Sequence, residues 1–270
     1  MKSSKRYISL VILSTGLFLM NAEAQVPQNK ALATLEAAPV CAPPPPKDPS
    51  VWSKSLIFGF NLTDGNSETL LLNTKASVSR DFENNIWNFL ASSAYGEDST
   101  KKDEGGTTTN QQDARVEASY KRLFTERFYS GFATNYFYDK VADIDYRVTL
   151  KPTVGYFVVR NDVVKLSFET GPGYVFERVG EVKKDFFAPL IGERLEWVIS
   201  ESSKLFQTAE VVFDADDSDN YLITTEAGLE AAINSHLSLV LSARNLHDGV
   251  PAEGKEKSDT VVGSALKVNF

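Results

Sequence analysis

The chain has 270 residues, of which 42% are hydrophobic, 24% charged and 11% aromatic, and it contains one cysteine. This composition excludes a collagen-like chain, a wholly disordered chain and a disulfide-rich scaffold. The formal net charge of −8 also disfavours a nucleic-acid-binding protein, because nucleic acids attract basic surfaces.

The first 24 residues predict a secretory signal peptide. Lys2, Lys5 and Arg6 give this segment a positive start, which an apolar stretch follows at 8–20. The residues at 22–24 read Ala-Glu-Ala, a small-residue cleavage pattern that leaves Gln25 as the mature N-terminus. The apolar stretch is too short for a spanning helix. We therefore expect domain 1–24 to be removed on export.

Residues 25–50 predict a disordered, extended Pro-rich periplasmic linker, because prolines recur there and four are consecutive at 43–46. A plain spacer is favoured, and a recognition tail is the alternative. Cys41 lies in this linker. Val40 and Pro39 fit a lipid-attachment site badly, so an incidental thiol is favoured over acylation.

From Val51 onward, apolar and polar residues alternate with period two, which indicates β-strands with one apolar face. Most segments are longer than a usual soluble strand and suit tilted strands that cross a bilayer. Twelve segments are predicted, at 52–63, 67–79, 84–95, 112–124, 127–139, 145–158, 163–177, 186–199, 203–214, 219–232, 236–247 and 257–270.

The connections between these segments alternate in length. Those after the odd segments are mostly long and polar, at 64–66, 96–111, 140–144, 178–185, 215–218 and 248–256. Those after the even segments are short, at 80–83, 125–126, 159–162, 200–202 and 233–235. Short periplasmic turns and longer external loops are typical of outer-membrane barrels. The sequence therefore predicts an all-β fold, a closed antiparallel transmembrane β-barrel of about twelve strands over 51–270.

Aromatic residues fall near both ends of the predicted strands, as the two interfacial girdles of a membrane barrel would require. One set comprises Trp52, Tyr120, Phe128, Tyr156, Trp197 and Phe270. The other comprises Phe60, Tyr138, Tyr146, Tyr174, Phe213 and Tyr221.

The polar strand faces then line the lumen. The candidate lining charges are Lys75, Arg115, Glu117, Lys121, Arg147, Lys151, Lys165, Glu169, Arg194, Glu196, Glu210, Glu226, Glu230, Arg244 and Lys267. The mixture of signs predicts ion pairs across the lumen, because unpaired buried charge is costly. Nine positive and six negative charges also predict weak anion preference if the lumen conducts. Glu193 shares a face with Ile191 and Trp197, and we expect a β-bulge near Gly192 to account for it.

The barrel begins with W-S-K-S-L-I-F-G-F-N-L-T-D-G-N at 52–66 and ends with an alternating strand that closes on Phe270. With the Gly65-Asn66 hairpin and the Tyr146-Arg147 centre, these segments resemble the salt-induced outer-membrane protein family, which has unknown function in Gram-negative bacteria. The resemblance implies an outer-membrane location and no catalytic motif. Phe270 resembles the terminal signal that the barrel assembly machinery reads. The resemblance thus implies that machinery, periplasmic chaperones and outer-membrane lipid as partners.

The remaining motifs give little chemistry. Asn245 and His247 share a strand face, but no serine stands at 245 or 249 to act as the nucleophile of a phospholipase, so no enzyme is predicted. With His236 as the only other histidine and a single cysteine, no transition-metal site or cofactor is expected. The acidic residues Asp214, Asp216, Asp217 and Asp219 lack the EF-hand glycine, so a solvated turn is favoured over a calcium site. The Gly-Pro-Gly at 171–173 predicts a strand kink.

Two functions follow as hypotheses. The first is a small passive channel for ions or small solutes, because twelve strands enclose a lumen wider than that of filled eight-stranded barrels. The alternative is a structural or stress-related envelope protein whose lumen side chains and ion pairs close. Conductance in planar bilayers separates the two.

Overall fold

A computed structural model describes residues 51–63, 68–99 and 107–270. The chain divides into two units, 1–40 and 41–270, and every described residue belongs to the second. The predicted signal peptide, the Pro-rich linker, Cys41 and the Gly65-Asn66 hairpin lie outside the described residues. Their boundaries stay predictions.

The described residues form an all-β structure in which every strand pairing is antiparallel. The strands are β1 (Ser53–Thr63), β2 (Glu68–Phe82), β3 (Asn85–Ser99), β4 (Thr107–Leu123), β5 (Phe128–Asp139), β6 (Ile144–Arg160), β7 (Val164–Gly171), β8 (Tyr174–Val179), β9 (Val182–Phe187), β10 (Leu190–Ser200), β11 (Ser203–Phe213), β12 (Tyr221–Ala232), β13 (Leu237–Asp248) and β14 (Ser258–Asn269). No helix within these ranges is long and apolar enough to cross a membrane.

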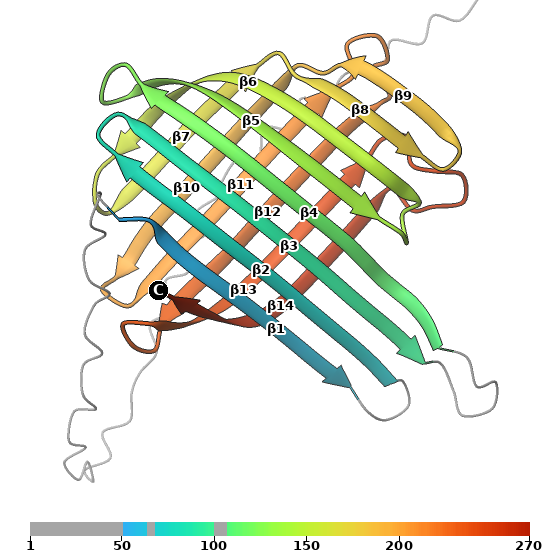
Figure 1. Ribbon diagram of the computed structural model, residues 1–270, viewed down its shortest axis with the longest axis horizontal. Helices are drawn as coiled ribbons and strands as arrows, with labels where there is room; N and C mark the ends of the chain where they lie inside the picture. Colours follow the sequence, from blue (N-terminus) through green and yellow to red (C-terminus); the bar gives the residue numbers. More distant parts are fainter. Residues whose placement is uncertain (1–50, 64–67, 100–106) are drawn as a thin grey trace, which may run out of the picture. The chain divides into compact units, whose positions relative to one another are not determined.

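The sheet closes on itself as a barrel (Figure 1). β1 pairs with both β2 and β14, and β5 pairs with both β4 and β6. The ring of twelve strands runs β1, β2, β3, β4, β5, β6, β7, β10, β11, β12, β13 and β14, and the β8–β9 hairpin continues it beyond β7 and β10. The predicted closed twelve-stranded antiparallel barrel is confirmed.

Closure is completed by the carboxyl-terminal strand. Leu56 on β1 pairs with Val268 on β14, and Phe58 pairs with Leu266. The backbone N–H of Phe270 donates to the carbonyl of Lys54 at 3.0 Å. The described β1–β14 pairing covers Ser55–Phe58 and Leu266–Asn269. Closure of a sheet removes unpaired strand edges, which is the condition for placing it in lipid.

Two predicted strands are each broken into two. The carboxyl half of β6 pairs with β7 and its amino half with β8, so the predicted strand 163–177 bends at Gly171-Pro172-Gly173. A Cβ atom on Gly171 would lie 2.0 Å from the carbonyl oxygen of Pro152, so the close approach of β6 requires glycine there. This agrees with the predicted kink. The strand 186–199 is likewise broken, between β9 and β10.

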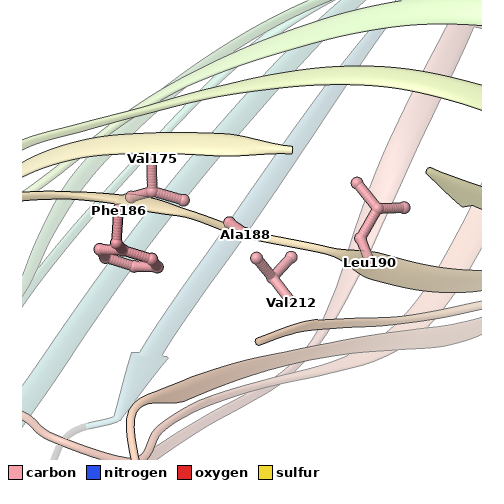
Figure 2. Packing of buried hydrophobic residues seen from close by; sticks show 5 residues of the cluster. All are labelled: Val175, Phe186, Ala188, Leu190 and Val212. Atoms are coloured by element: carbon pink, nitrogen blue, oxygen red, sulfur yellow. The ribbon is translucent and has the colours of Figure 1, made fainter. Parts of the chain in front are cut away.

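The predicted long loop 178–185 is wrong. Most of it is strand, because β8 and β9 form a hairpin joined at Gly180 and Glu181, with Gly180 at φ +58°. A positive φ favours glycine, which tightens this connection. A buried apolar cluster, shown in Figure 2, packs the hairpin against β10 and β11. Its members are Val175, Phe186, Ala188, Leu190 and Val212.

The two ends of the barrel differ in their connections. At one end the connections are 83–84, 124–127, 161–163, 201–202 and 233–236, and we name it the short-turn end. At the other, the long-loop end, they include 140–143, 180–181, 214–220 and 249–257. The connections 214–220 and 249–257 are longer than every described connection at the short-turn end, as predicted, whereas 140–143 is only as long as 124–127 and 233–236.

Strand alternation divides the side chains into an inner and an outer face. Large apolar side chains are exposed on the outer face, with Phe60 at 63% and Val262 at 68% exposure. In a soluble protein these groups would be buried, and a contiguous apolar surface of this kind marks a contact with lipid or protein. The girdle residues Phe128, Tyr156, Trp197 and Phe213 are exposed on this face, near strand ends. The inner face carries most of the charge.

Candidate functional site: a charged cavity inside the barrel

The inner strand faces enclose a cavity of about 490 Å³. Its charged lining comprises Lys75, Arg115, Lys121, Lys151, Arg194, Lys204, Arg244 and Lys267 together with Asp113, Glu117, Glu169, Glu196, Glu210, Glu226 and Glu230. The cations lie on β2, β4, β6, β10, β11, β13 and β14, and these acids lie on β4, β7, β10, β11 and β12. Glu193 also borders the cavity, although its register beside Phe168 places its side chain on the outer face of the barrel. The near balance replaces the positive excess expected from the sequence, and therefore removes the argument for anion preference.

Toward the long-loop end, ion pairs cross the barrel to β13 from two directions. Arg244 on β13 lies 3.0 Å from Asp113 on β4. Asp248, also on β13, lies 2.6 Å from Arg147 on β6. In the ring, four strands separate β13 from either partner on the shorter path. These contacts therefore bring almost opposite walls together and narrow the lumen at this level.

Arg147 is the centre of this constriction. Its Nε lies 2.5 Å from Glu177 on β8, while its Nη2 binds Asp248. The side chain is only 10% exposed, and that of Glu177 is 8% exposed. A guanidinium with two carboxylate partners satisfies a charge that would be costly to bury alone. Arg147 thus joins the β8–β9 hairpin to the far wall.

Further into the barrel, ion pairs cross the lumen between strands that are closer to each other in the ring. Lys75 lies 3.2 Å from Glu226, and Lys151 lies 2.9 Å from Glu210. These pairs join β2 to β12 and β6 to β11. They support the prediction of ion pairs across the lumen, because each joins strands that are not neighbours.

Near the short-turn end, β4, β5 and β7 meet through Tyr129. Lys121 lies 2.6 Å from Glu169, and the hydroxyl of Tyr129 donates to the same carboxylate at 3.0 Å. The Tyr129 ring is fully buried and packs with Leu123 and Phe157. This apolar cluster fills part of the lumen at its short-turn end.

Two cations in the lining are less fully compensated. Arg115 is 9% exposed, and its nearest carboxylate, Glu117, lies 3.4 Å away on the same strand. Its Nε has no hydrogen-bond partner among the described residues. Arg194 lines the cavity and forms no ion pair within the described part of the chain. Both can interact with a passing anion or with water.

The fifteen predicted lining charges fall into three groups. Thirteen of them line the cavity described above. Arg147 belongs to the constriction toward the long-loop end, which a smaller neighbouring cavity adjoins. Lys165 is exposed on the inward side of β7 near the short-turn end and does not line either cavity.

Several partners of these charges were not predicted from the sequence. Asp113, Glu177, Asp248 and Lys204 form ion pairs with predicted residues. Alternation alone could have found Asp113, which lies two residues before Arg115 in the same predicted strand. Glu177 and Asp248 fell at predicted strand boundaries, where alternation gives no signal. Pairing across the lumen cannot be predicted from strand patterning.

The expected bulge at Gly192 is absent, and the prediction is wrong. β10 pairs with β7 and β11 without a shift from Leu190 to Trp197. Gly192 lies opposite Glu169, whose carboxylate points inward, so the next residue, Glu193, faces outward beside Phe168. The sequence rule that places charges inward fails at this residue.

His247 has a hydroxyl neighbour that the strand pattern did not predict. Ser258 Oγ lies 2.6 Å from His247 Nδ1 across the β13–β14 pair, on the outer face. A serine hydroxyl therefore lies beside His247, contrary to the expectation from positions 245 and 249. No carboxylate or amide orients the second ring nitrogen among the described residues, so the acid member of a triad is not in place.

The acidic loop after β11 is not simply solvated. The Asp214 side chain is 1% exposed and lies 2.7 Å from Lys184 Nζ. Burial alone raises the pKa of Asp214, but hydrogen bonds from Lys184 and Asn220 outweigh it and hold this pKa below its ordinary value. The described residues contain no group of three acidic, histidine or cysteine side chains suited to a metal. The preferred interpretation of a solvated turn is thus wrong for Asp214.

The match to a known family decides the classification. A family model described as "Protein of unknown function, DUF481" matches residues 56–270. The chain belongs to this family. The family expected from the sequence is likewise one of unknown function. The description of the matching family does not mention salt. No curated protein matches the chain.

Several solved structures are similar to the described barrel. An outer-membrane channel from Pseudomonas putida F1 has a TM-score of 0.49 at 10% identity, covering 89% of this chain and 100% of that one. The NanC porin has a TM-score of 0.46 at 9% identity, covering 80% and 97%. The translocator domain of the autotransporter NalP from Neisseria meningitidis has a TM-score of 0.42 at 13% identity, covering 81% and 86%. Such low values carry no conclusion about solutes or partners.

Proposed function

We propose that the protein is an integral outer-membrane β-barrel that acts as a narrow passive channel for ions or small solutes. The observation that carries this proposal is the cavity of about 490 Å³, which is lined by both signs of charge inside a closed barrel. Charged rings in a low-dielectric wall provide the binding steps that passage of small polar solutes requires. The apolar outer face and the long strands support the membrane setting.

The constriction predicts a low conductance. Asp113–Arg244 and Arg147–Asp248 narrow the lumen between the cavity and the long-loop end, so only small species pass between these side chains. Since the lining charges are nearly balanced, selectivity is weak in either direction. Widening of the lumen at this level requires the Asp113–Arg244 and Arg147–Asp248 ion pairs to break.

A planar-bilayer recording in a salt gradient tests the channel. Arg194→Glu reverses a lining charge that has no ion pair to break within the described residues, and it should move the reversal potential toward cation selectivity. Arg178→Glu is the matched control, because Arg178 pairs with Asp145 at the exposed outer side of the barrel. A conducting wild type whose reversal potential is unchanged by Arg194→Glu would show that the ion path lies elsewhere.

The second candidate is a non-conducting structural protein of the envelope. The two contacts of β13 favour it, because they tie the barrel shut without a mobile plug. Absence of conductance in the wild type and also in Asp248→Asn would select this candidate. Conductance in Asp248→Asn but not in the wild type would instead identify a channel that the Arg147–Asp248 contact closes.

A further inference from the structure

The outer face of the barrel carries one polar pair that lipid does not satisfy. Glu193 on β10 faces outward beside Phe168, and Gln207 faces outward on β11. Both side chains are half-buried, and no hydrogen bond or ion pair satisfies either within the described part of the chain. Between 191 and 197 on β10 and between 205 and 211 on β11, the other outward positions are apolar, namely Ile191, Leu195, Trp197, Leu205, Ala209 and Val211.

The depth of this pair makes it costly. Glu193 is four residues from the girdle residue Trp197, and its partner Ala209 is four residues from the girdle residue Phe213. The pair therefore lies between the two girdles, at the hydrocarbon level of a bilayer. A carboxylate or amide without a partner at this level is disfavoured, so polar groups there mark contacts with other protein groups.

We propose that Glu193 and Gln207 form the centre of a two-fold interface with a second copy of this chain. The inference rests on the barrel spanning a bilayer. Glu193 has only acceptors when ionised, whereas Gln207 offers an amide donor. A two-fold axis brings the Gln207 amide of each copy against the Glu193 carboxylate of the other, so both copies are satisfied at once.

The strand geometry allows this arrangement. Two copies inserted in the same direction require an axis along the bilayer normal, so contacting groups must lie at equal depth. Figure 1 shows the strands running obliquely across the barrel. The register gives the sense of the tilt, because successive paired residues lead from Ser53 at the short-turn end of β1 to Lys151, well inside β6, and so step toward the long-loop end. With a strand tilt of about 40°, Ala209, the residue paired with Glu193, lies about 3 Å nearer the long-loop end than Glu193 does. Gln207 precedes Ala209 by two residues on β11 and lies about 5 Å nearer the short-turn end than Ala209. The two side chains thus lie within about 2 Å in depth and about 8 Å apart sideways.

The residues around the pair permit a close approach. The same geometry places Ala209 and Leu195 near the midpoint between Glu193 and Gln207, and therefore near the axis. On the neighbouring β12, the outward residues opposite Ala209 and Gln207 are Thr225 and Ala227. Small side chains let two membrane-embedded surfaces come together, and hydrogen bonds then fix their register.

Cross-linking in vesicles tests the interface. In a Cys41→Ser background, Ala209→Cys should form a disulfide-linked dimer on mild oxidation, because residue 209 faces its own copy. Val262→Cys on β14 is the matched control, since this residue is highly exposed on the outer face but distant in the ring. Heat-modifiable migration on a gel confirms that each variant folds as a barrel.

The polar pair is then tested by substitution in the Ala209→Cys background. Glu193→Leu removes both intermolecular hydrogen bonds and should lower the association constant about eightfold. Glu193→Gln retains hydrogen-bonding groups and should preserve the dimer. Absence of cross-linking through residue 209, an equal signal at residue 262, or an unchanged dimer in Glu193→Leu would each overturn the proposal. Cross-linking to a different protein in native membranes, without a dimer, would also overturn it. None of these readouts depends on conductance.

Discussion

Arg147 Nη2 lies 2.6 Å from Asp248 Oδ2, and this contact joins β6 to β13 across the inside of the barrel. Arg147 also binds Glu177 on β8, so a single guanidinium connects the hairpin, its neighbouring strand and the far wall. Removal of either acid leaves the guanidinium one partner. The two acids therefore have separable effects on the opening of the lumen and on its stability.

Asp248→Asn should weaken the constriction while Glu177 still compensates Arg147. We expect a larger single-channel conductance and a loss of about 2 kcal/mol in stability, the scale of a hydrogen bond to a charged group. The temperature of heat-modifiable unfolding and bilayer recordings measure the two effects. Asp145→Asn is the control, because its pair with Arg178 is solvent-exposed and should contribute less than 1 kcal/mol, the usual scale of surface pairs. Equal behaviour of both variants would argue against a structural role for the contact.

Gly155→Ala should destabilise the short-turn end of the lumen. A Cβ atom at this position would lie 2.2 Å from Cζ of Tyr129, whose ring is buried and lies directly across the β5–β6 pair. Overpacking of this kind costs about 1–3 kcal/mol. Gly192→Ala is the control, since its nearest contact is the flexible Glu169 side chain at 3.3 Å. Urea unfolding from vesicles compares the two, and a Gly155→Ala protein as stable as Gly192→Ala would contradict the packing argument.

Deletion of Phe270 should reduce assembly. Its backbone N–H donates to Lys54 on the strand that closes the ring, and its side chain is 73% exposed on the outer face. The deletion removes one closing hydrogen bond and one interfacial aromatic ring. Membrane fractions should contain less of the truncated protein, and the remainder should accumulate before insertion. Phe270→Tyr keeps the aromatic ring and should assemble normally. Equal membrane levels of all three proteins would remove any role for this residue.

Acid should loosen the loop after β11 through Asp214. The pKa of this carboxyl is held below its ordinary value, so its ionised form contributes stability at neutral pH. That contribution is complete above the unfolded pKa, near 4, and is lost as the pH falls through the lower folded pKa. Proteolysis of the loop between pH 5 and pH 3 should increase more steeply in the wild type than in Asp214→Asn. Asp216→Asn, at an exposed position, should behave like the wild type.

Strand patterning was sufficient for most of the fold. Alternation from Val51 to Phe270 predicted the strands, because a strand with lipid on one face and water on the other alternates between apolar and polar residues. The loop lengths predicted which strand ends face the periplasm, because periplasmic turns are short and external loops are longer. The kink at Gly171-Pro172-Gly173 was likewise local information. The β8–β9 hairpin was not predicted, because each of its strands has only six residues. Its buried residues Val175 and Phe186 pair with each other and pack with Leu190 and Val212, and these contacts leave no signal in the strand period.

Strand period predicted an inward direction for the charges on the polar strand faces, because successive side chains of a strand point to opposite faces. Which of these charges meet depends on barrel closure, because Arg147 reaches Asp248, and Arg244 reaches Asp113, between segments more than one hundred residues apart. Glu193 shows the same division. Its outward direction follows from an unbroken register with β7 and β11, and that register is fixed by pairing between strands rather than by the residues around it.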